Sequence, residues 1–166
     1  LQTQYIQKNL LLTVLGHYGR NVTFQDDLKI GSKAEDDLLE KLRQAFPLAS
    51  RAEGLHPDFD INIPELNKTI EVKFDPRSND TGNIVIEYFH NKPSAFSVSQ
   101  ADYWVIDTGS EVLWFTRQKI LECILGWELN PVKIHGAGDR YSKWVFLIPL
   151  KILREYRNDR NRITYS

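Results

Sequence analysis

The sequence predicts a mixed α/β (α+β) fold, with helices flanking a central mixed β-sheet. Apolar residues recur at helical spacing before residue 47, they alternate with polar residues between 59 and 74, and further strand-like and helical stretches follow. The 166 residues correspond to about one domain, and 42% apolar with 26% charged residues is typical of a globular protein. We therefore expect one domain over 1–166 with its core at about 31–150.

Two helices are expected in the first third of the chain. Residues 4–16 carry apolar side chains at helical spacing. A second apolar stripe follows Ser32, a suitable N-cap, and stops before Pro47, which predicts a helix at about 33–46. The stripe consists of Leu38, Leu39, Leu42 and Phe46.

A β-hairpin is expected between residues 59 and 74, where the apolar period changes to two. Because side chains alternate across a strand, apolar and polar residues fall on opposite faces. The apolar face consists of Phe59, Ile61, Ile63, Ile70, Val72 and Phe74. The polar face consists of Asp58, Asp60, Asn62, Glu71, Lys73 and Asp75.

The second half of the chain is expected to add strands and two helices to this hairpin. Strands are predicted at 84–89, 103–107, 111–115 and 144–148, helices at 116–125 and 149–162, and a loop at 127–142.

The polar face of the hairpin brings charged groups together in either of two registers. A loop of residues 64–67 places Asp60 opposite Glu71, and a two-residue loop at 66–67 places Asp60 opposite Lys73. Opposed Cβ atoms lie about 4.5 to 5.5 Å apart, and two carboxylates so close repel each other unless a cation or a proton lies between them. Mg²⁺ suits such a pair because carboxylates supply one or two of its ligands. An adjacent lysine then serves metal-assisted phosphodiester hydrolysis.

This arrangement of acids and lysine resembles the PD-(D/E)xK nuclease superfamily. The resemblance rests on an aspartate, a short hairpin and then Glu71-Val72-Lys73, with Glu35 on the preceding helix. The segments from Thr81 to Tyr88, from Lys92 to Ser94 and from Ala101 to Trp104 look like phage-type endonucleases of this superfamily. The likeness covers roughly residues 31–107.

The resemblance implies a restriction-endonuclease-like core and cleavage of DNA with Mg²⁺, for which Mn²⁺ substitutes. It implies that Glu71 and one aspartate bind the metal and that the carbonyl of Val72 completes the site. It also implies that Lys73 is the catalytic lysine, and that Glu35 contacts the metal or a metal-bound water. An isolated acid-x-Lys pattern is typical of a solvated strand face with ion pairs, so only the combination favours a nuclease.

Two aspartates compete for the place in the motif. Asp58 belongs to the literal Pro-Asp pair and lies thirteen residues before Glu71, whereas Asp60 lies eleven before it. Both spacings occur in the superfamily, and both aspartates fall on the same face. We expect Asp60 to be the ligand, with Asp58 as the alternative.

The expected function is that of a Mg²⁺-dependent DNA endonuclease encoded by a phage or a mobile element. A Holliday-junction or branched-DNA resolvase and a homing endonuclease of the same superfamily are alternatives. A non-catalytic nucleic-acid-binding domain on the same fold is the alternative of another class. Two cuts on a duplex usually need two active sites, so a homodimer is a further hypothesis.

Contacts to DNA must come from local basic residues, because the net charge of −1 argues against broad nucleic-acid binding. Residues 151–162 hold five basic and two acidic side chains. We expect Arg154, Arg157 and Arg160, spaced by three, to share one helical face and follow the DNA backbone. Lys92 and Gln100 are further candidate contacts.

Several other classes are excluded. No apolar stretch approaches the length of a membrane span, and Gly136-Ala137-Gly138 lacks the strand and helix context of a nucleotide-cofactor loop. The single Cys123 excludes an internal disulfide and fits a cytoplasmic location. We expect no signal peptide, and the lack of methionine at position 1 suggests a start that has been trimmed, processed or engineered.

Overall fold

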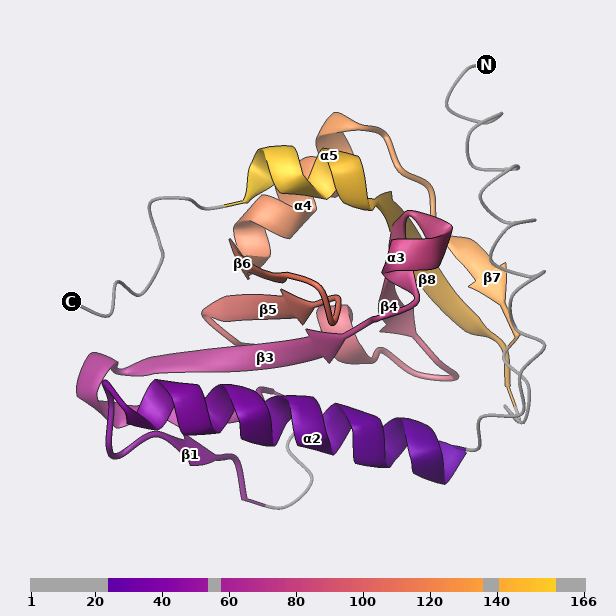
Figure 1. Ribbon diagram of the computed structural model, residues 1–166. Helices are drawn as coiled ribbons and strands as arrows, with labels where there is room; N and C mark the ends of the chain where they lie inside the picture. The colour runs from indigo at the N-terminus through magenta and orange to yellow at the C-terminus, as the bar shows by residue number, and fades with distance from the viewer. Residues whose placement is uncertain (1–23, 54–57, 136–140, 158–166) are drawn as a thin grey trace.

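The computed structural model describes residues 24–53, 58–135 and 141–157, with side chains from Lys29 onward. Within these ranges, four α-helices accompany a five-stranded mixed sheet and a three-stranded antiparallel sheet (Figure 1). The mixed α/β prediction is therefore confirmed, although the strands divide into two sheets where one was expected. The helix predicted at 4–16 lies outside the described residues.

The first sheet has the strand order β1-β2-β3-β5-β6. Its strands are β1 (Ser50–Arg51), β2 (Ile61–Ile63), β3 (Lys68–Phe74), β5 (Tyr103–Asp107) and β6 (Val112–Thr116). Only β3 and β5 run parallel, and the other neighbours are antiparallel. The long connection that a parallel pair requires contains α3 (Ser78–Thr81), β4 (Asn83–Phe89) and the 3₁₀ turn η2 (Ala95–Ser97).

The second sheet places β8 (Lys143–Pro149) between β4 and β7 (Val132–Ile134). The strand β7 lies inside the stretch 127–142 that was predicted to be loop, so that prediction is wrong there. Three residues are too few to show a period of two, and β7 forms because the backbone of β8 offers it a pairing edge. The segment 136–140 of the predicted loop lies outside the described residues.

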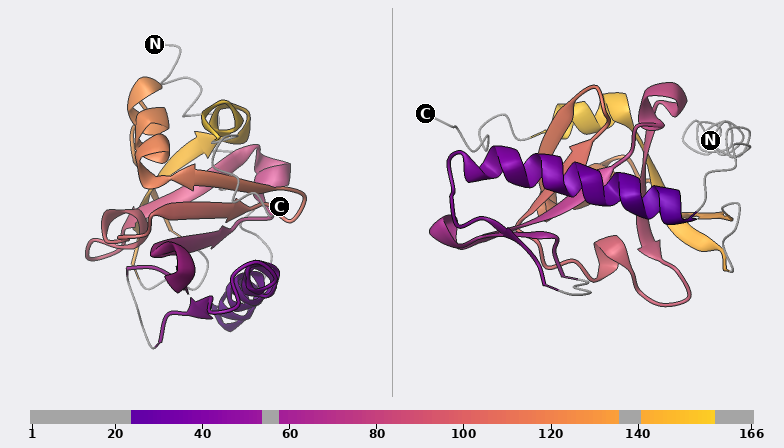
Figure 2. Two further views of the ribbon diagram at one scale, coloured as in Figure 1. Left: turned by 90° about the vertical axis from the view of Figure 1, so that its left-hand side faces the viewer. Right: turned by 60° about the horizontal axis from the view of Figure 1, so that its bottom comes forward.

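The helix α2 (Phe24–Arg43) crosses one face of the first sheet (Figures 1 and 2). It begins well before the predicted start near 33 and ends before residue 46. Ser32 is therefore an interior helical residue and not the N-cap, and its hydroxyl instead accepts hydrogen bonds from the Arg51 guanidinium. Tertiary packing of the apolar stripe overrides the low helix propensity of Gly31 and Ser32.

The face of the hairpin that meets α2 is apolar, as predicted. Ile61, Ile63 and Ile70 are fully buried, together with Leu42 of the helix. Phe59 departs from the prediction, since it packs against the cluster on the other side of the sheet. Phe59 lies two residues before β2 begins at Ile61, so the alternation of side chains along a strand does not apply to it.

We expect Leu42→Ala to lower the free energy of unfolding by about 2–5 kcal/mol, because the fully buried side chain would leave a cavity between α2 and the hairpin. Denaturant unfolding followed by circular dichroism measures this loss. Leu48→Ala is the control, because Leu48 is 66% exposed and its truncation should change stability by no more than about 0.5 kcal/mol. Equal effects of the two substitutions would contradict the packing described.

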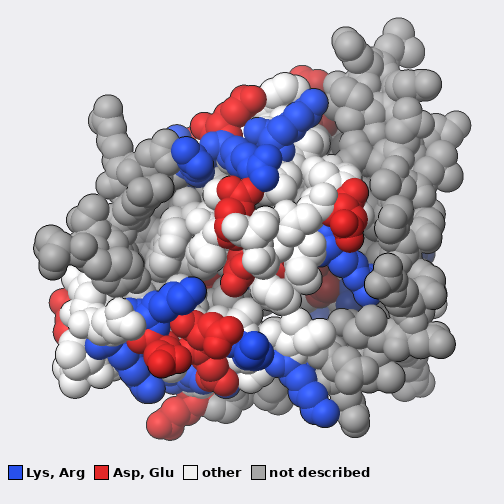
Figure 3. Space-filling model, in the orientation of Figure 1, with Lys and Arg blue, Asp and Glu red and all other residues white. Residues whose placement is uncertain are grey.

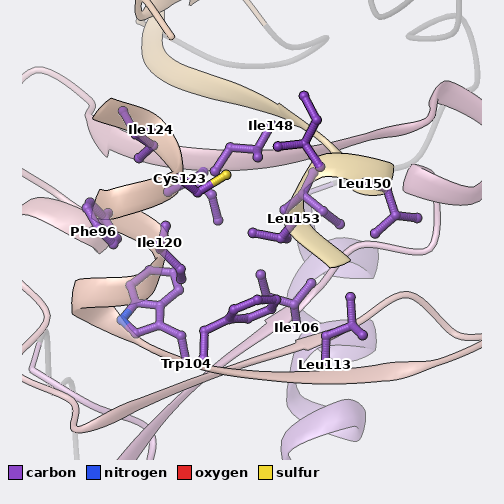
Figure 4. Packing of buried hydrophobic residues seen from close by; sticks show 14 of the residues in the cluster. Phe96, Trp104, Ile106, Leu113, Ile120, Cys123, Ile124, Ile148, Leu150 and Leu153 are labelled. Atoms are coloured by element: carbon purple, nitrogen blue, oxygen red, sulfur yellow. The ribbon is translucent and has the colours of Figure 1, made fainter. Parts of the chain in front are cut away.

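The larger core lies on the opposite side of the first sheet from α2. There α4 (Arg117–Gly126) and α5 (Leu150–Tyr156) pack on the first sheet and on β4 and β8 (Figure 4). Thr116 caps α4 by accepting a hydrogen bond of 3.2 Å from the backbone N–H of Lys119. Among the described helices, none has the length and apolar character that a bilayer crossing requires.

Candidate metal centre

The hairpin adopts the register in which Asp60 comes opposite Glu71. Ile61 pairs with Ile70, and the pairing continues to a loop of residues 64–67. This loop forms the 3₁₀ turn η1 (Pro64–Leu66) and closes at Asn67, whose φ of 50° is a left-handed conformation that asparagine tolerates. Of the two registers that the sequence left open, the structure has the one that opposes the two acids.

Asp60 immediately precedes β2, at the point where β3 continues beyond its pairing with β2. Its Oδ2 accepts a hydrogen bond of 2.7 Å from the backbone N–H of Val72. Its own backbone N–H donates to the carbonyl of Ile70 at 2.9 Å, and its carbonyl accepts from the N–H of Ala52 at 2.8 Å. Two of these hydrogen bonds hold Asp60 against β3, beside Glu71, and the third holds it to the residue that follows β1.

Glu71 and Lys73 lie on the side of the sheet that faces away from α2. In the parallel ladder they pair with Trp104 and Ile106, both of which belong to the larger core. The Oε2 atom of Glu71 accepts a hydrogen bond of 3.1 Å from the hydroxyl of Ser99, which is only 3% exposed. One hydrogen-bond donor to this carboxylate therefore comes from a segment that lies 28 residues further along the chain.

The two opposed acids have strongly perturbed ionisation. The pKa of Asp60 is raised to about 6, because burial and the negative charge of Glu35 together outweigh the hydrogen bond from Val72 and the charge of Arg51. Burial and the charge of Asp60 raise the pKa of Glu71 to about 8, although Ser99 and Lys73 favour its anion. Near neutral pH the pair resists full ionisation, and a bound cation would relieve both the desolvation and the repulsion.

Glu35 reaches the margin of this centre from α2. The guanidinium of Arg51, in β1, forms an ion pair with it, and also lies 3.4 Å from Asp36. Glu35 can contact a metal only if this ion pair opens. In the described part of the chain, no three His, Cys, Asp or Glu side chains are already grouped to hold a metal. The arrangement therefore offers two carboxylates, which is enough for Mg²⁺ when water or phosphate supplies the rest.

Asp58 takes a different position from Asp60. Its backbone carbonyl accepts hydrogen bonds from the N–H of Gln100 at 2.8 Å and from the hydroxyl of Ser99 at 3.2 Å. These bonds tie the start of the hairpin to the segment before β5. Between the two candidate aspartates, Asp60 is the one whose carboxylate is shown beside β3 at Val72.

The residues predicted to contact DNA are dispersed. Lys92 and Gln100 are exposed on the connection from β4 to β5. The Arg154 guanidinium is paired with Glu111, at 2.8 Å from Nε to Oε1. The predicted arginine face is wrong for Arg157, because α5 ends at Tyr156 and Arg157 has an extended backbone. Arg160 lies outside the described residues.

The surface charges agree with this dispersal. On the face seen in Figure 3, acidic and basic side chains lie interspersed over α2 and do not separate into one basic surface. Electrostatic attraction of a polyanion to that face is therefore weak without a bound cation.

Two residues at the centre escaped the site prediction. Arg51 gave no signal, because a strand of two residues has no readable pattern. Ser99 precedes Gln100, and the sequence allows for both residues either a contact with DNA or a capping or packing role. Its contact with Glu71 requires the fold.

Glu87 lies on β4, in the second sheet, and its carboxylate contacts other residues than those of this centre. It accepts a hydrogen bond of 2.7 Å from the Ser94 hydroxyl and lies 3.7 Å from the ammonium of Lys143.

Comparisons with known proteins add no relative. No family model matches the chain, and searches of curated proteins and of solved structures find no significant match. What the site can do is therefore argued from its own residues.

Proposed function

We propose that this protein is a Mg²⁺-dependent DNA endonuclease that hydrolyses phosphodiester bonds at the centre formed by Asp60, Glu71 and Lys73. The observation that carries the proposal is the opposed pair of partly buried acids whose pKa values are both raised. A purely structural strand face would pair each acid with a base or leave it in water. Placing two desolvated acids side by side costs stability, which is typical of a site kept for function.

The residues present suit a hard divalent cation. Asp60 and Glu71 would hold Mg²⁺, with the carbonyl of Val72 as a third ligand, and Mn²⁺ would substitute because it accepts the same oxygen ligands. When bound, the metal supplies the positive charge that polarises a phosphate oxygen and favours deprotonation of water. Glu35 would contact the metal or its water once it leaves Arg51.

Lys73 would supply the positive charge that the two acids cannot supply. It lies two residues after Glu71 on the same face of β3, and its charge favours the Glu71 anion. The ammonium would orient the attacking water and neutralise the charge that develops on the phosphate. A carboxylate pair with a lysine beside it therefore favours catalysis over nucleic-acid binding alone.

The metal also accounts for how DNA could approach an acidic centre. The chain carries a net charge of −1, and Asp60 and Glu71, when ionised, would repel phosphates. A bound divalent cation would neutralise the charge of the two ionised acids, and the exposed Lys92 and Gln100 would add contacts. Arg154 is a weaker candidate than expected, since its ion pair with Glu111 would have to open.

A thermal melt with and without metal tests the centre. We expect millimolar Mg²⁺ or Mn²⁺ to raise the melting temperature of the wild type, because a ligand at 100 times its Kd stabilises the folded state by about 2.7 kcal/mol. The same protein is incubated with supercoiled plasmid, linear duplex, single-stranded DNA, a four-way junction and RNA. Unchanged melting together with no cleavage of any substrate would refute the proposal.

The substrate panel also separates the related alternatives. Preference for the four-way junction would indicate a branched-DNA resolvase, and cuts at one site of a plasmid would indicate a homing endonuclease. Binding without any cleavage would indicate the non-catalytic alternative. A homodimer, which paired cuts would favour, is tested by light scattering. The phage or mobile-element origin and the cytoplasmic location belong to the same proposal.

A further inference from the structure

The segment that joins η2 to β5 has a conformation set by several contacts. The guanidinium of Arg117 donates from Nη2 to the carbonyl of Phe96 at 3.1 Å and lies 4.7 Å from the centre of its ring. That ring packs edge-on against Trp104, with 5.3 Å between centroids. Ala95 has a φ of 42°, which non-glycine residues keep only where their surroundings determine it. These contacts therefore fix the position of the residues that follow Phe96, including Ser99.

Within this segment, Ser99 is the residue that contacts the candidate centre. Its hydroxyl oxygen accepts a hydrogen bond of 3.3 Å from the N–H of Ala101. Its single proton has two acceptors within reach, the carbonyl of Asp58 at 3.2 Å and Oε2 of Glu71 at 3.1 Å. The Asp58 carbonyl already accepts from the N–H of Gln100 at 2.8 Å. Because a hydrogen bond to an ionised carboxylate is stronger than one to an amide carbonyl, the Ser99 hydroxyl donates to Oε2 whenever Glu71 is ionised.

We propose that Ser99 is a positioning residue for Glu71, which fixes Oε2 so that Oε1 is turned to the cation shared with Asp60. The inference rests on the proposed function. A glutamate side chain rotates with little preference about its last torsion, so a single firm contact decides which oxygen faces the metal. Residues that orient metal ligands in this way typically contribute 10 to 100-fold to metal affinity or activity.

The test compares three substitutions at Ser99 with one at a neighbouring serine. Ser99→Ala removes the hydroxyl, Ser99→Cys keeps the volume with a much weaker donor, and Ser99→Thr keeps the donor. Ser97→Ala is the matched control, because the exposed Ser97 hydroxyl donates to the carbonyl of Tyr88 and not to a carboxylate. Isothermal titration with Mg²⁺ gives the Kd, and cleavage kinetics give kcat and KM separately.

We expect Ser99→Ala and Ser99→Cys to weaken Mg²⁺ binding by about 10 to 100-fold and to lower kcat more than they raise the KM for DNA. Ser99→Thr should recover most of the affinity, and Ser97→Ala should bind Mg²⁺ like the wild type. If the wild type binds Mg²⁺ and Ser99→Cys binds it equally well, the positioning role is refuted while the nuclease proposal stands. If the wild type neither binds Mg²⁺ nor cleaves DNA, both are refuted.

Discussion

Glu71→Gln is expected to abolish Mg²⁺-dependent cleavage and, in the metal-free protein at pH 8, to raise the melting temperature. The amide keeps the shape of the side chain but carries no charge, so it removes both the buried anion and its repulsion with Asp60. It also removes a proposed metal ligand. A substitution that stabilises the fold while it destroys activity is the signature of a residue kept for function.

The pH dependence follows from the raised pKa values. An acid whose folded-state pKa lies above its unfolded value contributes stability that is complete below the unfolded pKa and is lost as the pH rises through the folded pKa. For Glu71 the window runs from its ordinary 4.5 to about 8, and for Asp60 from 3.8 to about 6. The metal-free wild type should therefore lose stability between about pH 4 and pH 8, and Glu71→Gln should lose much less.

Differential scanning fluorimetry in EDTA at pH 5 and pH 8 measures the effect. The shift of Glu71 from 4.5 to about 8 would correspond to about 5 kcal/mol at about 1.4 kcal/mol per unit. Because the metal-free protein relaxes and admits water around the anion, we expect a smaller gain, on the order of 1–2 kcal/mol at pH 8, or a few degrees in melting temperature. Glu122→Gln is the control, because Glu122 belongs to an exposed ion pair with Lys119, and such pairs contribute little to stability. A lower melting temperature of Glu71→Gln at both pH values would mean that Glu71 is a structural residue.

Asp60→Asn should abolish cleavage, whereas Asp58→Asn should retain most of it. The asparagine oxygen can still accept the hydrogen bond from the N–H of Val72, so the substitution removes the charge and keeps the contact with β3. Loss of a metal ligand should exceed the 10 to 100-fold cost that is typical of a supporting residue. Asp58 contributes its backbone carbonyl to the contacts described here, and its replacement by asparagine leaves that carbonyl unchanged.

Single-turnover cleavage rates over a titration of Mg²⁺ distinguish the two aspartates. For Asp60→Asn we expect no recovery of the rate at high Mg²⁺. The opposite ranking, with Asp58→Asn inactive and Asp60→Asn active, would assign the motif to the literal Pro-Asp pair and would contradict the role given to Asp60.

The sequence alone determined the elements whose residues interact with near neighbours. Periods of 3.6 and of two located the core of α2, the hairpin and the strand Tyr103–Asp107, because burying one face imposes its spacing on consecutive residues. The same alternation put Glu71 and Lys73 together on the side away from the apolar residues that meet α2. Local patterning therefore identified the acids and the lysine of the candidate centre.

The register of the hairpin was decided only by the tertiary structure. The two open registers differ by two residues, and a shift of two leaves every side chain on the same face. Burial of Ile61 and Ile70 therefore cannot distinguish them. The turn that closes at Asn67 in a left-handed conformation does, and it is this turn that opposes Asp60 to Glu71.

Contacts between distant segments were also beyond the sequence. The strand β4 pairs with β8, which begins more than fifty residues after β4 ends, so the split into two sheets has no local signal. Ser99 reaches Glu71, and Arg51 reaches Glu35, from elements separated by long stretches of chain. Arg154 likewise forms an ion pair with Glu111 and therefore does not contribute to a continuous arginine face. Such pairings depend on where whole elements pack, because the residues that form them share no period along the chain.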